Sequence, residues 1–218
     1  WSRSRWEQDT DFSDFCRKNR TWLEDYALFM ALKDSFGGRE WQAWPEEIRL
    51  RRPAALADWQ KRLRQETIFW KYVQYLFFSQ WERLKDYANQ KGIRMIGDIP
   101  IYVAMDSADV WIGGSRFQLD ENRQPTAVAG VPPDLFSATG QLWGNPLYDW
   151  QAMEQDGFSW WRARMASCAA LYDLVRIDHF IGVVHYYAIP AGEDTAMNGR
   201  WLTGPGEKLL EAIGPTLA

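Results

Sequence analysis

The segment Arg176-Ile177-Asp178-His179 has the clearest potential for chemistry in this sequence. Alternate residues of a strand point to the same side, so Arg176 and Asp178 are neighbours if the segment is extended. A guanidinium beside a carboxylate keeps it ionised and fixes its direction, as a carboxylate nucleophile requires. A structural ion pair is the alternative interpretation. The position at the end of a predicted strand, next to His179, favours catalysis.

A second carboxylate, Asp98, follows an apolar stretch and precedes Pro100. Alone, an aspartate between Gly97 and a proline-containing turn is typical of a residue that caps a loop. As the last residue of a second parallel strand, it would share an edge with Asp178, where α/β folds gather their active-site groups. We therefore predict Asp98 as a further polar residue of the site.

Aromatic and amide side chains gather in the segment between these two aspartates. Aromatic faces stack on the apolar faces of sugar rings, while amides and carboxylates bind sugar hydroxyls. The candidates for such contacts are Tyr102, Asp134, Phe136, Gln141, Trp143, Asn145 and Tyr148. The alternative is that these aromatics pin an irregular loop to the body of the protein.

Hydrophobic periodicity indicates that residues 11–92 are mainly helical. It predicts helices from Thr21, as N-cap of a capping box, to Phe36, and over about 54–65 and 66–90. On the last of these helices it predicts a buried stripe of Trp70, Val73, Phe77, Trp81 and Leu84. The chain has 14 tryptophans. We predict that Trp70 and Trp81 of this stripe, and Trp160 and Trp161, are packing residues.

The second part of the chain alternates between strands and helices. Branched residues predict a buried strand over 93–103 and a second short strand over 174–178, with helices over 159–172 and 207–212. The stretch 104–150, rich in Gly and Pro, predicts a long functional loop. This order indicates an α/β fold with parallel strands.

Composition excludes several classes of protein. The net charge of −4 lacks the basic surface of a nucleic-acid binder, and no apolar run is long enough to span a membrane. Two distant cysteines, Cys16 and Cys168, indicate free thiols and a cytoplasmic protein. With only two histidines, the chain cannot form a multi-histidine metal centre. The sequence also lacks the phosphate-binding motifs that would indicate a nucleotide cofactor. The absence of an initial methionine suggests an internal fragment.

Several long motifs closely resemble the bacterial 4-α-glucanotransferase (amylomaltase) family. They are IGDIPIYVAMDSADVW (96–111), AGVPPDLFSATGQLWGNPLYDW (129–150), LVRIDHF (174–180) and YYAIPAGEDTAMNGRWLTGPG (186–206), and FCRKNRTWLEDYALFMALKDSFGG (15–38) agrees as well. The resemblance covers nearly the whole chain. It implies a (β/α)8 barrel with helical insertions, here a helical subdomain at 1–92 and a barrel portion at 93–218.

The resemblance also implies an activity, which is retaining transfer of α-1,4-glucan segments between maltooligosaccharides without a cofactor. By motif position, Asp178 is the nucleophile and Arg176 orients it, with Asp98 nearby. The loop over the glucan would include Asp134, Phe136, Gln141, Trp143, Gly144 and Asn145, and His179 would line the donor site. Two positions depart from the family pattern: Ile181 replaces a frequent Arg, and Leu135 replaces a frequent Tyr.

Retaining transfer also needs an acid/base carboxylate about 5–5.5 Å from the nucleophile. The family places it on the next barrel strand, which we expect beyond residue 218, so we predict that the 218-residue chain alone is inactive. Two alternatives stay open, namely a non-catalytic segment that binds glucan or a partner, and an amylase-type hydrolase.

Overall fold

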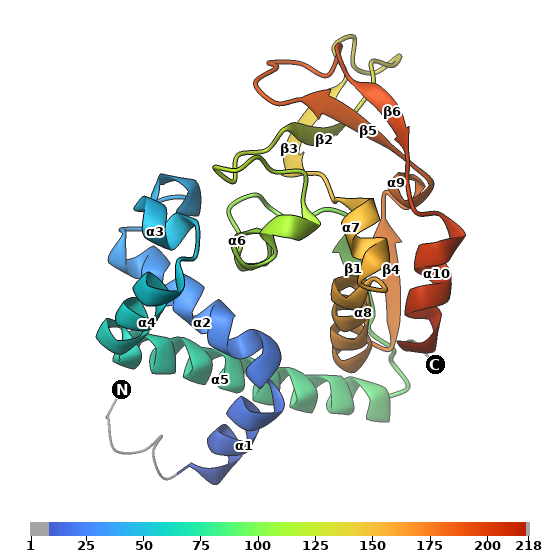
Figure 1. Ribbon diagram of the computed structural model, residues 1–218. Helices are drawn as coiled ribbons and strands as arrows, with labels where there is room; N and C mark the ends of the chain where they lie inside the picture. Colours follow the sequence, from blue (N-terminus) through green and yellow to red (C-terminus); the bar gives the residue numbers. More distant parts are fainter. Residues whose placement is uncertain (1–8, 217–218) are drawn as a thin grey trace. The chain divides into compact units, whose positions relative to one another are not determined.

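The computed structural model describes residues 9–216, and the chain divides into two compact units (Figure 1). The first unit ends at Tyr87 and the second begins at Ala88. Among the described residues, no helix is both long and apolar enough to cross a membrane.

The first unit is helical. It contains α1 (Thr10–Lys18), α2 (Arg20–Ser35), η2 (Trp41–Ala43), α3 (Glu46–Arg49), α4 (Pro53–Arg62) and most of α5 (Arg64–Gln90). One set of apolar residues of α2 recurs at helical spacing and is fully buried together with Trp41 and Ile48, namely Leu23, Ala27, Leu28, Ala31 and Leu32. The predicted helices over 54–65 and 66–90 are confirmed as α4 and α5, whose ends differ from the prediction by up to three residues.

The start of α2 differs from the prediction. Thr21 lies inside the helix, and Asn19 is both the C-cap of α1 and the N-cap of α2. The carbonyl of Asn19 accepts the N–H groups of Trp22 and Leu23 at 3.2 and 3.0 Å. Because α1 and α2 meet at a single residue, the second helix begins before the capping-box signal.

The predicted buried stripe on α5 is wrong. No residue of α5 is buried, and Phe77 and Leu84 are 50% and 52% exposed. Another part of the helix packs against α1 and α2, where the rings of Phe12 and Tyr72 are 5.3 Å apart and those of Trp22 and Phe78 are 5.7 Å apart. This helix is apolar on several sides. Periodicity identifies these apolar faces, but it does not indicate which of them packs against other helices.

The second unit contains a parallel pair of strands, β1 (Ile96–Pro100) and β4 (Leu174–Asp178), which lie side by side in Figure 1. The register sets Asp98 opposite Arg176 and Pro100 opposite Asp178. Helix α8 (Ser159–Leu171) leads into β4. The predicted parallel strands are therefore confirmed.

Two details of these strands correct the sequence-based expectation. β1 is not buried throughout, because Asp98 and its alternate neighbours are exposed. Asp98 is also not the last residue of β1, because the strand continues to Pro100. A proline is tolerated at a strand end, where its missing N–H does not interrupt the ladder.

The stretch 104–150 is not one long loop. It contains α6 (Ala108–Ile112), η3 (Gly114–Arg116), β2 (Ala127–Val131) and β3 (Gln141–Pro146). These strands join β5 (His185–Pro190) and β6 (Arg200–Thr203) in an antiparallel sheet of order β3-β2-β5-β6 (Figure 1). A side chain at Gly130 would overlap the Gln141 carbonyl, so glycine allows β2 and β3 to approach closely.

The remaining elements of this unit are α7 (Trp150–Gln155), α9 (Ile181–Val184), α10 (Glu207–Ile213) and η4 (Gly214–Thr216). The predicted helices over 159–172 and 207–212 are thus confirmed. Tryptophan packing is only partly as predicted. Trp161 is fully buried, whereas Trp70, Trp81 and Trp160 are half-buried. Within residues 9–216, the other fully buried tryptophans are Trp41 and Trp111.

Gly97 of β1 lies directly against the ring of Tyr172, and a Cβ at this position would overlap that ring. We expect Gly97→Ala to lower the free energy of unfolding of the chain by about 1–3 kcal/mol, because the ring or the strand must shift. Urea denaturation measures the change. Gly214→Ala is the matched control, since no atom lies within 4 Å of the point where its Cβ would stand. Equal stability of Gly97→Ala and wild type would refute the close approach.

Candidate active site

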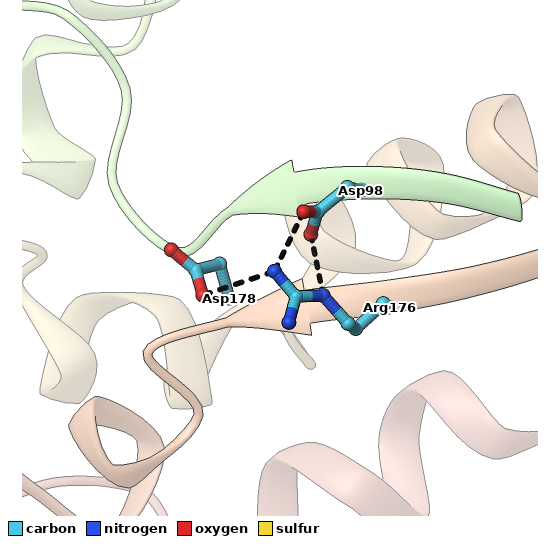
Figure 2. A network of polar contacts seen from close by, with 3 residues as sticks. All are labelled: Asp98, Arg176 and Asp178. Carbon is cyan, nitrogen blue, oxygen red and sulfur yellow. Dashed lines mark hydrogen bonds and ion pairs between the residues drawn. The ribbon is translucent and has the colours of Figure 1, made fainter.

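Three charged side chains form one network at the carboxyl ends of β1 and β4 (Figure 2). Arg176 donates from Nε to Oδ1 of Asp98 at 2.9 Å and from Nη2 to Oδ2 at 2.6 Å. The same Nη2 donates to Oδ1 of Asp178 at 3.4 Å. The predicted neighbourhood of Arg176 and Asp178 is present, and Asp98 lies in the same network.

The two carboxylates are held very differently. Asp98 receives a two-point, charge-assisted contact, which fixes the guanidinium plane. Asp178 accepts one long hydrogen bond from Arg176, which orients the carboxylate but binds it weakly. The side chains of Asp98, Arg176 and Asp178 are 54%, 63% and 62% exposed, so these pairs orient groups more than they stabilise the fold. A carboxylate that is oriented but loosely bound is suited to nucleophilic attack.

The hydrogen bonds from Arg176 hold the pKa of Asp98 below its usual range, and those bonds raise the pKa of Arg176 in return. Because the pKa of Asp98 is lowered in the folded state, the unfolded chain binds more protons near the ordinary aspartate pKa of about 3.9, and stability rises with pH there. The stabilisation is present above this pKa and is lost as the pH falls through the lower folded value.

This linkage gives a prediction for Asp98→Asn. The difference in free energy of unfolding between wild type and Asp98→Asn should shrink as the pH falls below about 4, because the asparagine does not titrate. Denaturant titrations at a series of acidic pH values measure the difference. A difference that stays constant or grows with acidity would contradict the assigned Asp98–Arg176 pairing.

His179 follows Asp178 in a left-handed backbone conformation (φ 51°), which turns the chain out of β4. Its ring meets that of Trp143 edge to face, with centroids 4.7 Å apart. Burial lowers the pKa of His179 against the opposing effect of Asp178, which favours the uncharged imidazole. The buried ring of Tyr102 lies 6.3 Å from that of Trp143. An aromatic wall therefore adjoins Asp178.

The other predicted contact residues divide into two sets. On β3, Gln141 accepts the indole N–H of Trp143 at 3.0 Å, and Asn145 donates to the Val103 carbonyl at 2.9 Å. Gly144, between them, has a φ of 77° that favours glycine. These residues form one group with Trp143.

Asp134 and Phe136 are not part of this group. Asp134 accepts the backbone N–H groups of Phe136 and Ser137 at 2.8 and 2.7 Å, which shapes the turn between β2 and β3. The side chain of Phe136 is 96% exposed at this turn. The structure thus presents an exposed aromatic ring on a defined turn, apart from the Asp178 network.

Two further residues hold the chain next to the site. Tyr148 donates its hydroxyl to the Ile101 carbonyl at 2.7 Å, and Arg164 donates to the carbonyls of Pro100 and Ile101. The prediction of Tyr148 as a sugar contact is wrong, because its side chain is fully buried and pins the loop to the body of the protein. Arg164 lies three and four residues after Trp161 and Trp160, a helical spacing that suggests a cation over aromatic rings but no particular role. Among residues 9–216, no group of three His, Cys, Asp or Glu side chains is placed to hold a metal ion.

Parallel strands that carry interacting carboxylates at their carboxyl ends are typical of (β/α)8-barrel enzymes. The fold and the site therefore define an α/β protein with a candidate active site built on carboxylates. The chain belongs to the 4-alpha-glucanotransferase family, which matches residues 2–217.

Individual relatives agree with this assignment. The chain is 48% identical over 208 residues to a 4-alpha-glucanotransferase from Clostridium butyricum, covering 95% of this chain and 43% of the relative. It is 51% identical over 207 residues to one from Thermus thermophilus, covering 95% and 41%. Among solved structures, an amylomaltase from Streptococcus agalactiae in complex with acarbose superposes with a TM-score of 0.91 at 41% identity, covering 97% of this chain and 44% of that chain.

These matches confirm the predicted family and fold class: the chain is α/β and corresponds to part of a (β/α)8 barrel. The chain spans about two fifths of the length of the curated relatives that it matches.

Proposed function

We propose that this protein, in the complete gene product, transfers α-1,4-glucan segments between maltooligosaccharides with retention of configuration. The observation that carries this proposal is the network of Asp98, Arg176 and Asp178 on two adjacent parallel strands. A carboxylate at a strand end, directed by an arginine that a second carboxylate anchors, has the arrangement expected of a glycosidase-type nucleophile. The family assignment supplies the substrate class.

In the proposed reaction, a carboxylate oxygen of Asp178 attacks the anomeric carbon of the donor sugar. The bond from that carbon to the glycosidic oxygen breaks, and an acid group protonates the departing oxygen. The hydroxyl of the acceptor glucan then attacks the same carbon and loses its proton to the acid/base group, and Asp178 leaves as a carboxylate. Two inversions at one carbon give net retention.

Arg176 has two tasks in this scheme. It directs Asp178 towards the sugar, and its hydrogen bonds to Asp98 hold the pKa of that carboxyl below its usual range. Asp98 acts through Arg176, because its two-point contact fixes the guanidinium plane. The acid/base carboxylate is a further requirement. Glu193 pairs with Asn198 in a loop and is a poor candidate, so we propose that the acid/base lies outside residues 1–218.

We propose that Trp143 and Gln141 of β3, together with His179 after β4, line the sugar-binding channel. Trp143 is 37% exposed, which leaves part of its ring free to stack on a sugar, while Gln141 and His179 fix its orientation. Gly144 and Asn145 belong to the same proposed surface, and we propose that Phe136, on the turn that Asp134 shapes, adds a separate sugar contact. The relative from Streptococcus agalactiae was solved with acarbose, in keeping with a carbohydrate ligand.

The test of the proposed function is incubation of the complete gene product with maltotriose. We expect glucose together with maltooligosaccharides longer than the substrate, since transfer lengthens an acceptor. Shorter sugars with no longer products would instead show an amylase-type hydrolase, and binding without turnover would show a glucan-binding protein. Neither alternative is favoured by the family assignment.

Trp143→Ala tests the binding wall. Loss of an aromatic stacking contact of about 0.5–1.5 kcal/mol should raise KM for maltotriose by up to about tenfold, with a smaller change in kcat. Steady-state kinetics measure both constants. Trp201→Ala, which removes another half-exposed tryptophan from β6, is the matched control and should leave KM unchanged. Equal effects of the two substitutions would exclude Trp143 from the channel.

We also propose a cytoplasmic location. Cys16 and Cys168 are both free thiols, as is usual for proteins of reducing compartments.

A further inference from the structure

Three backbone carbonyls at the end of β1 are held by side chains from other elements. Arg164 of α8 donates from Nη2 to the Pro100 carbonyl at 2.6 Å and from Nη1 to the Ile101 carbonyl at 3.0 Å. The Ile101 carbonyl also accepts the hydroxyl of Tyr148 at 2.7 Å. Asn145 holds the Val103 carbonyl. The chain that leaves the strand carrying Asp98 is therefore fixed at several closely spaced points.

The guanidinium of Arg164 is itself held in place. It lies over the rings of Trp160 and Trp161, with 5.3 and 5.0 Å from its central carbon to the ring centroids. Trp161 is fully buried, and the buried ring of Tyr148 packs 5.6 Å from it. A rigid planar fork that spans two adjacent carbonyls is a geometry that arginine provides and lysine does not.

The clamped carbonyls adjoin the Asp98–Arg176–Asp178 network. Pro100 is the register partner of Asp178, and Asp98 lies two residues before Pro100 on the same strand. The contact between Asp98 and Arg176 depends on two short hydrogen bonds of 2.9 and 2.6 Å, so a small displacement of β1 would lose one of them. Misplacement of an active-site group by about 1 Å can cost on the order of a hundredfold in rate.

We propose that Arg164 is a positioning residue of the active site: it fixes the carboxyl end of β1, and thereby holds Asp98 in two-point contact with Arg176. This role rests on the proposed function, because it serves the orientation of Asp178 as nucleophile. The hydrogen bonds of Arg164 go to the carbonyls of Pro100 and Ile101 and to the hydroxyl of Tyr148, and not to Asp178. Arg164 acts on the reaction through the backbone of β1.

A double-mutant cycle in the complete gene product tests the proposal. Arg164→Gln should lower kcat for maltotriose by about tenfold or more and leave KM within about twofold, because orientation and not binding is lost. In the Asp98→Asn background, the same substitution should change kcat by less than about twofold, since the contact it protects is already gone. Arg162→Gln, an exposed arginine on the same helix, is the matched control and should change neither constant.

Assays are made at a temperature where thermal denaturation shows every variant folded. An equal loss of kcat in both backgrounds would overturn the proposal, because Arg164 would then act independently of Asp98. Unchanged kcat in Arg164→Gln would overturn it as well.

A structural measurement separates this proposal from the proposed function. In a crystal structure of the Arg164→Lys variant of the complete gene product, we expect one of the two Asp98–Arg176 hydrogen bonds to be lost. This readout needs no activity, so it holds even if the wild type fails to disproportionate maltotriose. An unchanged two-point contact would overturn the role of Arg164 whatever the enzyme's activity.

Discussion

Asp178→Asn in the complete gene product is expected to lower kcat for maltotriose disproportionation by on the order of 10⁴-fold or more. An amide has no negative charge and cannot form the glycosyl ester, so the first half of the proposed reaction is blocked. The side chains are nearly equal in size, and Asp178 is exposed at the end of β4, so the fold should not change. Kd for maltooligosaccharides should stay within about threefold of wild type, because the attack and not the binding is lost.

Steady-state kinetics and calorimetric titration of the same preparation measure both quantities. Asp194→Asn is the matched control, because it removes the same charge from a loop position in the same unit and should leave kcat unchanged. Asp178→Asn with kcat close to wild type would remove Asp178 from the nucleophile's role. Loss of glucan binding together with kcat would assign it to binding instead.

Arg176→Lys is expected to have the next largest effect. Lysine keeps the positive charge but lacks the planar fork that joins Nε and Nη2 to the two oxygens of Asp98. Asp178 would lose the contact that directs it. We expect kcat to fall by about 10²–10³-fold, comparable with the loss of one preorganised group at a reacting centre.

The same kinetic measurement tests this expectation, with Arg200→Lys on β6 as the matched control. The pKa of Asp98 should rise towards its usual range in Arg176→Lys, because the two hydrogen bonds that lower it are reduced. Carbon-13 NMR of the Asp98 carboxyl measures this shift. A kcat within about threefold of wild type would show that charge alone, and not geometry, is what Arg176 supplies.

The strand 174–178 can be predicted to the residue because short runs of branched residues between a helix and a turn have few other interpretations. The alternation of side chains then places Arg176 beside Asp178 without any structure. The position of Asp98 is predicted less accurately. The sequence suggests a strand end, whereas the register shows Asp98 opposite Arg176 and two residues before that end. The sequence therefore predicts that Arg176 and Asp178 are neighbours, but it does not predict the register between the two strands that sets Asp98 opposite Arg176.

Two features could not be predicted for physical reasons. Strands β2 and β3 pair across a glycine-containing turn. Glycines such as Gly130 make this stretch resemble a loop in the sequence, but in the structure they allow the two strands to approach closely. The clamp of Arg164 and Tyr148 on β1 depends on contacts between residues 47 to 64 positions apart, whose chemistry is with backbone carbonyls. Backbone acceptors occur at every residue, so no residue type identifies such partners.

The central claim is that Asp178 forms a covalent bond with the donor sugar. Incubation of the complete gene product with an α-glucosyl fluoride whose ring fluorine slows turnover should accumulate that intermediate, since fluoride departs without an acid. Mass spectrometry of the digested protein should then find one glycosyl residue on the peptide that contains Asp178. A label on a different carboxylate, or an active enzyme that never acquires a label, would contradict the account.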